Sequence, residues 1–267
     1  MRARAITSGA LLTTIIACGG SSTPPHPPPP IAAKPPVVAE VDASVTLDAG
    51  TLDAGSTSDS NLARTLQMTT VPLAGATEPA LLDFITYDQG RVWIPFVSGK
   101  KGIVDVFDAA KGTFTEINGF KTVERESHGK TRALGPSSVA VGDGVAYVGN
   151  RGTNEVCVVD GTKLKVGKCF KTASPPDGVA YVASVKEVWV TTPQTQTIAV
   201  FDASNKNVLK LKATIKTDGE PEGYAVDAAR DLFFTNLEDK NRTLAIDVKT
   251  HTLTSNWSTG CGADGPR

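Results

Sequence analysis

The sequence predicts an all-β protein assembled from a repeated unit of four short strands. Two observations lead to this fold class. The chain of 267 residues contains 25 glycines and 6% aromatic residues, a composition that suits many tight turns between short strands. From about residue 61 onward the chain also resembles itself at intervals of 42 to 54 residues. Self-similarity on this scale is typical of folds built by repetition.

Three features of the sequence recur in step. An aromatic residue within a short apolar strand is followed 13 to 15 residues later by an Asp that ends a second apolar strand, and a proline lies 11 to 14 residues before the aromatic residue. Each unit is therefore expected to run from Pro through strands A, B and C to an Asp turn and strand D, which is the spacing of β-propeller blades. The aromatic residues are Trp93, Tyr147, Trp189 and Phe233, the aspartates are Asp108, Asp160, Asp202 and Asp247, and the prolines are Pro79, Pro136, Pro176 and Pro221.

The repeated residue types have a structural explanation. The aromatic residue is expected to be a spacer between neighbouring blades, because burying such a ring contributes on the order of 2 to 3 kcal/mol. A stacking platform for a sugar or a base is its functional alternative. The repeated Asp suits an Asx turn, in which its carboxylate accepts hydrogen bonds from backbone N–H groups two residues further on.

The second unit gives the clearest family resemblance. Tyr147 to Asp160 reads Tyr-Val-Gly-Asn-Arg-Gly-Thr-Asn-Glu-Val-Cys-Val-Val-Asp and resembles the YVTN repeat, with Gly149 where that motif has Thr. The third unit, Trp189 to Asp202, is nearly as similar, whereas the first and fourth units are expected to carry one or two extra residues between strands B and C. The resemblance covers residues 61–267 and implies a β-propeller, in a family where rings of seven blades are usual.

Four units do not make seven blades. The segment Thr65 to Val71 is expected to be a closing strand that joins the last blade, as in the resembled family. Pro266 follows Pro221 by the same interval of 45 residues that separates Pro176 from Pro221, so we expect the chain to be part of a longer protein with a closed seven-bladed ring. Four blades that close alone or with a partner are the alternative.

The first 17 residues predict export. Arg2 and Arg4 precede an apolar run from Ala5 to Ala17, which is too short to span a bilayer and suits the core of a signal peptide. The run ends in Ile-Ile-Ala-Cys, which resembles a bacterial lipobox and implies a lipid on Cys18. The expected partner of this end is therefore the membrane of the bacterial cell envelope, on its periplasmic or surface side. A plain signal peptide is the alternative.

Residues 18–60 predict a disordered tether. Eight of the 17 prolines lie between Pro24 and Pro36, and a Thr-Leu-Asp-Ala-Gly pentapeptide occurs twice in succession from Thr46. Such a stretch buries too little apolar surface to offset the entropy of ordering. The predicted organisation is thus a signal peptide (1–17), a linker (18–60) and a propeller (61–267).

Composition and cysteine spacing limit the chemistry. With 27 basic against 28 acidic residues, no electrostatic footprint for nucleic acid is present. Cys157 and Cys169 fall on strands C and D of one hairpin and are candidates for a disulfide in an exported protein; two reduced core residues are the alternative. The three histidines, His26, His128 and His251, suggest no catalytic triad and no metal cluster. No catalytic residue and no cofactor is evident.

Acidic residues flank the prolines that open strand A. Because these positions would recur around one mouth of a propeller channel, they form a candidate ring for a cation or a basic ligand of unknown identity; turn chemistry beside proline explains them equally. The charged insertion Lys121 to Leu134 is expected to be a surface loop and a candidate contact site. The ring candidates are Glu78, Asp177, Glu220, Glu222 and Asp264.

Two classes of function remain. The first is a non-catalytic binding or protein-interaction scaffold that offers a propeller face to a protein or a small-molecule ligand. The second is an enzyme, since propellers related to the resembled family include lactonases and quinoprotein-like dehydrogenases. The metal ligands of the former and the cofactor residues of the latter are not recognisable in this sequence. The fold does not decide between the two classes.

Overall fold

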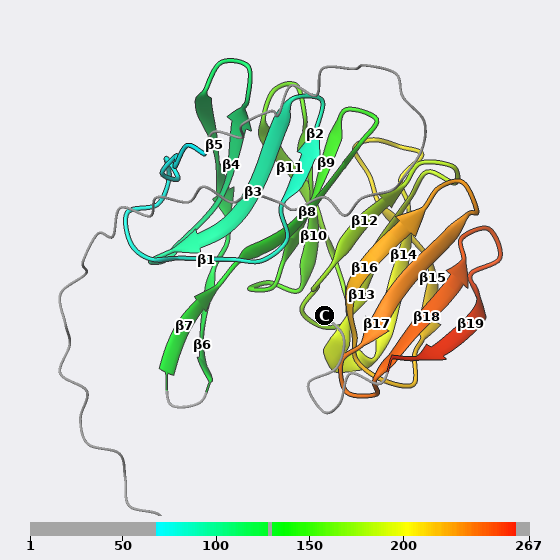
Figure 1. Ribbon diagram of the computed structural model, residues 1–267. Coiled ribbons are helices and arrows are strands. Elements are labelled where there is room, and N and C mark those ends of the chain that lie inside the picture. Colours follow the sequence, from blue (N-terminus) through cyan, green and yellow to red (C-terminus); the bar gives the residue numbers. More distant parts are fainter. Residues whose placement is uncertain (1–67, 128–129, 260–267) are drawn as a thin grey trace, which may run out of the picture. The chain divides into compact units, whose positions relative to one another are not determined.

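The computed structural model describes residues 68–127 and 130–259, which belong to one compact unit, Leu66–Arg267. They form four antiparallel sheets of the same plan, called blades 1 to 4, which follow one another along the chain from cyan to red in Figure 1. Apart from one 3-10 helix, Pro193–Thr195, the described elements are strands, which confirms the all-β propeller prediction. In this part of the chain no helix is long and apolar enough to cross a membrane. The predicted signal peptide, Cys18, the linker, His128 and Asp264 lie outside the described residues.

Each blade contains strands A to D in chain order, and in blade 1 the two strands β1 and β2 together form strand A. Blade 1 consists of β1 (Ala80–Leu82), β2 (Thr86–Asp88), β3 (Arg91–Ser98), β4 (Lys101–Asp108) and β5 (Thr113–Phe120). Blade 2 consists of β8 (Pro136–Gly142), β9 (Val145–Asn150), β10 (Glu155–Asp160) and β11 (Lys165–Lys171). Blade 3 consists of β12 (Val179–Val182), β13 (Glu187–Thr192), β14 (Thr197–Asp202) and β15 (Lys210–Lys216). Blade 4 consists of β16 (Pro221–Asp227), β17 (Leu232–Leu237), β18 (Arg242–Asp247) and β19 (Thr252–Ser258).

Strand A of blade 1 is divided into two pieces. Both β1 and β2 pair with β3, and the three residues between Leu82 and Thr86 face only two residues of β3 between their partners Phe96 and Trp93. Pro95 lies in that stretch of β3 and has no N–H to donate to strand A, so the ladder is interrupted there. The interruption turns the backbone N–H of Phe84 to the carbonyl of Ser137 in blade 2, at 3.0 Å.

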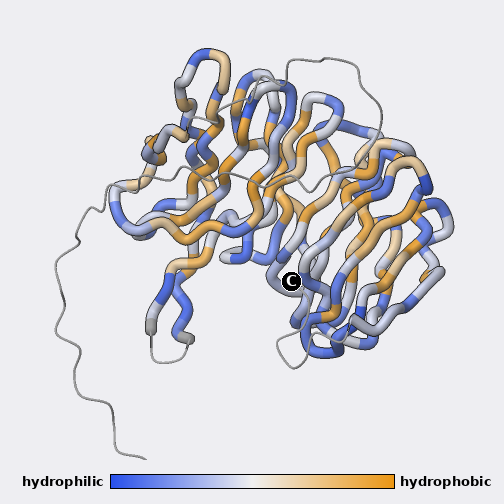
Figure 2. The backbone as a smooth tube through the Cα atoms, viewed as in Figure 1, coloured by the Kyte–Doolittle hydropathy of each residue, from blue (hydrophilic) through white to orange (hydrophobic). Residues whose placement is uncertain are grey.

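The blades pack face to face through three apolar cores. Trp93 lies in the core between blades 1 and 2, Tyr147 in the core between blades 2 and 3, and Trp189 in the core between blades 3 and 4. All three side chains are at most 1% exposed. Figure 2 shows the apolar segments running along the strands, with hydrophilic residues at the turns. Among residues 68–127 and 130–259, no fourth core joins blade 4 to blade 1.

Phe233 packs between blades 3 and 4 as predicted, but it lies one residue before the position that the other repeated aromatic residues occupy. Trp189 is the third residue of β13, which starts opposite Asp202, and the third residue of β17, which starts opposite Asp247, is Phe234 rather than Phe233. Phe233 faces back to blade 3, with its ring 4.8 Å from that of Trp189. Phe234 is on the other face of the sheet, because successive side chains of a strand alternate. Counted from Phe234, the interval to Asp247 equals that of the second and third units, so the fourth unit carries no extra residue.

The predicted Asx turns are confirmed. The carboxylates of the four repeated aspartates accept hydrogen bonds from the N–H groups of Ala110, Thr162, Ser204 and Lys249, each two residues further on. Backbone N–H groups of the same turns hold the pKa of Asp160 and of Asp247 below the usual value. These local bonds start strand D without help from the rest of the fold.

Met68–Val71, the described part of the predicted closing strand, form no strand. The prediction requires a last blade that lacks strand D, and no such blade is among the four described, so the closing strand stays a prediction. All four blades already have a strand D of their own, so none has a vacant edge for this segment. The chain instead runs over blade 1, where the N–H of Gly75 donates to the buried carboxylate of Asp105 at 3.2 Å.

The insertion between blades 1 and 2 is a hairpin rather than a loop. β6 (Val123–Ser127) pairs with β7 (Lys130–Leu134) as a separate two-stranded sheet. An ion pair of 3.0 Å between Lys100 and Glu124 ties it to blade 1.

Candidate functional site

One polar cavity draws residues from all four blades. Its volume is about 480 Å³, and we call it the four-blade cavity. Blade 1 contributes the interruption of strand A, blade 2 the residue after β9, blade 3 the residues before β12, and blade 4 part of β16 and the residue after β17. The lining residues are Asp83, Phe84, Arg151, Asp177, Glu222, Gly223 and Glu238.

Two repeated positions of the blade supply the charged side chains. Asp177 and Glu222 each follow the proline that opens strand A and lie opposite the fifth residue of strand B, Thr191 and Asn236 respectively. Asp83 occupies the matching place in blade 1, just after the pair Leu82–Phe96. Arg151 and Glu238 both come directly after the last residue of strand B. The repeat thus places chemically different side chains at equivalent points around the cavity.

A bulge in strand A aims these residues into the cavity. In β16 the register shifts between Glu222 and Tyr224, so that Gly223 is an extra residue with a φ of 56°. That left-handed conformation favours glycine. Because a bulge bends its strand, the preceding carboxylate turns away from the ladder and toward the cavity.

Arg151 is the electrostatic centre of the cavity. Its guanidinium forms ion pairs with Asp83, at 2.6 Å, and with the buried carboxylate of Asp177. Its Nε donates to the carbonyl of Pro176 at 3.4 Å. Four carboxylates and one guanidinium line the cavity, so its formal charge is negative when all of them are ionised. The carboxylates of the lining therefore outnumber its guanidinium four to one.

The structure brings together two of the five predicted ring residues. Asp177 and Glu222 line the four-blade cavity. Glu78 lies in a separate cavity of about 510 Å³ beside Lys100 and Glu124. Glu220 is not among the lining residues, and its backbone N–H donates to Asp239 at 2.7 Å. The ring as predicted is therefore wrong for Glu78 and Glu220. Their equivalence was judged by proximity to proline, although the bulge sets the direction of the side chain.

Sequence reasoning missed Asp83, Arg151 and Glu238. In blade 1 the proline stands four residues before the acidic position rather than one, so Asp83 did not align with Asp177 and Glu222. The signal that finds it is its distance to the aromatic residue, since Asp83 precedes Trp93 by ten residues as Ser137 precedes Tyr147. Arg151 and Glu238 each come directly after the last residue of strand B, so they can be recognised as equivalent only when the end of that strand is known.

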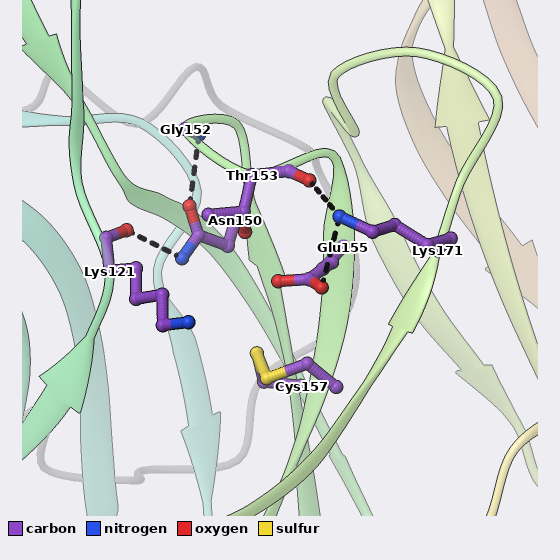
Figure 3. Close-up of a disulfide and its surroundings, with 8 residues drawn as sticks. Lys121, Asn150, Gly152, Thr153, Glu155, Cys157 and Lys171 are labelled. Carbon is purple, nitrogen blue, oxygen red and sulfur yellow. Dashed lines mark hydrogen bonds and ion pairs between the residues drawn. A yellow bond between two sulfur atoms is a disulfide. The ribbon is translucent and has the colours of Figure 1, made fainter.

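The second candidate feature is the cysteine pair of blade 2. Cys157 on β10 lies directly opposite Cys169 on β11, and the structure joins them by a disulfide. Figure 3 shows the neighbouring Lys171 between the carbonyl of Thr153 and the carboxylate of Glu155. The two sulfurs and a Glu155 oxygen lie within 4.8 Å of one another, but bridged sulfurs are not the thiolates that a metal ion requires.

A buried carboxylate links blades 3 and 4 away from the cavity. Glu187, 1% exposed, accepts from Lys212 at 2.6 Å and from the indole of Trp189 at 3.0 Å. His251, in the turn between β18 and β19, places Nε2 3.0 Å from the same carboxylate. Its imidazole also lies edge-on to Trp189, at 5.6 Å. These contacts tie Glu187 of blade 3 to the turn between β18 and β19 of blade 4.

The comparisons with known proteins agree with the fold. No protein-family model matches the chain, and no curated protein is similar enough to count as a relative. Among solved structures, hydrazine synthase of Kuenenia stuttgartiensis aligns with a TM-score of 0.53 at 20% identity, over 72% of this chain and 52% of that one. The β-propeller domain of Cps50 (Swd1) from Myceliophteria thermophila aligns with a TM-score of 0.50 at 11% identity, over 68% and 56%.

The chain is therefore a β-propeller protein. It spans about half the length of both solved structures, and at such identities the likeness shows the fold alone. A third structure, the dihydro-heme d1 dehydrogenase NirN, aligns at a TM-score of 0.48 and 13% identity over 63% of this chain and 35% of that one. Its likeness is too low to support an argument about function.

Proposed function

We propose that this protein is an exported, lipid-anchored propeller of YVTN type that binds a protein or small-molecule ligand without catalysing a reaction. The observation that carries the proposal is the four-blade cavity, where Asp83, Arg151, Asp177 and Glu222 converge from four blades. The cavity volume of about 480 Å³ lies within the range of protein ligand pockets, about 300 to 1,000 Å³.

The anchoring half of the proposal rests on the N-terminal sequence. A cysteine at position 18 after Ile-Ile-Ala resembles a lipobox, and acyl chains on that residue would hold the protein at the envelope. The test is incorporation of labelled palmitate by the full chain in a bacterial host, compared with the variant Cys18→Ser. Equal labelling of both proteins would refute lipidation at Cys18.

The binding half can be tested at a single position of the cavity. A photo-reactive benzoylphenylalanine replaces Phe84, which lines the cavity, and in a matched control it replaces Leu211, which is 56% exposed on the outer strand of blade 3. After irradiation of intact cells we expect an adduct from position 84 and none from position 211. The bound molecule is identified by mass spectrometry and its affinity for the purified chain is then measured. Adducts of the same identity from both positions would contradict a site in this cavity.

The rival reading, an enzyme of lactonase or quinoprotein-dehydrogenase type, requires turnover. The purified chain is incubated with aliphatic and aromatic lactones, with and without calcium, and with quinone-dependent alcohol and sugar substrates plus an electron acceptor. We expect no turnover above that of the heat-denatured protein. Metal-dependent hydrolysis that is lost in Glu222→Gln would replace the binding proposal with the enzymatic one.

A further inference from the structure

We propose that the four-blade cavity and an apolar recess beside it form one site for an alkyl cation, an ammonium or guanidinium group on an aliphatic stem. The side chain of a Lys or Arg residue in a peptide and a free aliphatic amine share this chemistry. The inference rests on the proposed binding function and names the ligand class of the same cavity.

The apolar recess adjoins the cavity through a shared wall. Its volume is about 210 Å³, and Asp83 and Arg151 line both spaces. Leu81 and Leu82, at 46% and 45% exposed, leave apolar surface open to solvent on the recess. The remaining lining residues are Val97, Leu134, Gly135, Pro136 and Ser137. A ligand that spans both spaces therefore needs a charged or polar end and an aliphatic part.

Ser137 gives an independent indication of a ligand. It lines the recess, is 7% exposed, and its Oγ has no hydrogen-bond partner. Buried hydroxyl groups nearly always have a partner, because leaving one unmade costs free energy. Ser137 also follows Pro136 in blade 2, the position that carries Asp177 in blade 3 and Glu222 in blade 4. A polar group next to the aliphatic stem of the ligand would satisfy this hydroxyl.

The charges of the cavity favour a cation. Arg151 is already paired with Asp83 and Asp177, so an anionic ligand would have to displace those carboxylates. Glu222 and Glu238 line the same cavity and keep its net charge negative. The ring of Phe84 is part of the wall, and an aromatic face attracts an ammonium or guanidinium group.

A bare metal ion fits the observations less well. A divalent cation needs several oxygen ligands gathered within a few ångströms. Here a guanidinium lies between two of the carboxylates, and the cavity of about 480 Å³ is much larger than one ion. A metal ion would also leave the apolar recess and the Ser137 hydroxyl without a role.

The test is calorimetric titration of the purified full chain with four probes. These are agmatine, 1-aminopentane, the amide of the dipeptide Leu-Lys, and 1-pentanol as the neutral stem; calcium chloride is titrated separately. We expect the three cationic probes to bind and pentanol and calcium not to bind. Tighter binding of the dipeptide than of the free amines would assign the site to a peptide side chain, and the reverse order would assign it to a small amine.

Three variants connect binding to the residues. Glu222→Gln should weaken agmatine binding by about tenfold, as expected for the loss of one charge-assisted hydrogen bond. Ser137→Ala should weaken binding of the dipeptide amide more than binding of 1-aminopentane, whose stem carries no polar group. Glu78→Gln removes a carboxylate from the separate cavity and should leave every affinity unchanged. Circular dichroism and thermal unfolding of each variant establish that it is folded.

The outcomes separate this inference from the function on which it rests. If no cationic probe binds while the Phe84 cross-link is still formed, the ligand class is wrong and the binding function stands. If the cross-link is absent as well, both the ligand class and the proposed binding function are wrong. Calcium binding that Glu222→Gln abolishes, or unchanged agmatine affinity in Glu222→Gln, would overturn the alkyl-cation site.

Discussion

Two adjacent phenylalanines in blade 4 provide a sharp test of the structure. Phe233 is 0% exposed and stacks on Trp189 in the core between blades 3 and 4. Phe234 lies on the opposite face and is partly exposed beside Trp257, which is itself 48% exposed. We predict that Phe233→Ala destabilises the protein far more than Phe234→Ala.

The magnitudes follow from burial. Truncation of a fully buried phenylalanine removes its transfer free energy and leaves a cavity, for a loss of about 3 to 5 kcal/mol. Complete burial of a phenylalanine side chain contributes roughly 1.5 to 3 kcal/mol, so a partly exposed ring such as Phe234 should lose about 1 kcal/mol and leave no closed cavity. The expected difference between the two variants is about 2 to 4 kcal/mol, from the same two principles.

The assay is equilibrium urea unfolding of the full chain carrying Cys18→Ser, followed by tryptophan fluorescence and circular dichroism. The free energy of unfolding is taken from the midpoint at a common slope. Phe233→Leu serves as the conservative control and should recover more than half of the loss. Equal losses for the two alanine variants, or a larger loss for Phe234→Ala, would refute the register of β17 and with it the corrected repeat.

Three further predictions concern buried polar groups and the disulfide. Burial raises the pKa of Asp105, so the contribution of Asp105 to stability increases as the pH falls. The stability of Asp105→Asn relative to the parent should therefore increase from pH 4 to pH 7, and a difference in urea titrations that does not change with pH would contradict this. Reduction of the disulfide, or the double variant Cys157→Ser and Cys169→Ser, opens a loop of 12 residues and should lower the free energy of unfolding by about 2 to 3 kcal/mol. A melting temperature that is the same with and without reductant would show that the bond does not stabilise the blade. Glu187→Ala leaves the indole N–H of Trp189 without its acceptor and should cost about 2 to 3 kcal/mol, with Glu187→Gln recovering part of the loss; a neutral Glu187→Ala would show that the network is dispensable.

Local chemistry explains why so much of the fold could be predicted. The carboxylate of Asp160 makes its turn with N–H groups two and three residues away. An apolar strand can likewise be predicted from the pattern of its own residues. The opening prolines, the B and C strands and the Asx turns were therefore placed correctly in advance. The hairpin β6–β7 was missed because its many charged residues were interpreted as a solvated loop, although charged side chains can also alternate along a strand.

Local sequence does not determine which face of a strand a side chain occupies. Sliding the pairing by one residue moves every side chain to the other face, so a Phe-Phe pair in β17 cannot be oriented from its own sequence. The neighbouring blade decides it, through the contact of Phe233 with Trp189. The predicted closing strand depends on the assembled blades in the same way, because a strand forms only where a sheet edge is available.

The sequence by itself determined that this chain is a propeller of four-stranded units and that acidic residues flank several of the prolines that open strand A, because both features are evident from short-range spacing. Only the tertiary structure decided which of those carboxylates meet. Asp83, Arg151, Asp177 and Glu222 belong to four different blades, and the stacking of the blades together with the bulges of strand A brings them to one cavity. Convergence of this kind depends on the direction of each side chain in space, which spacing along the chain does not encode.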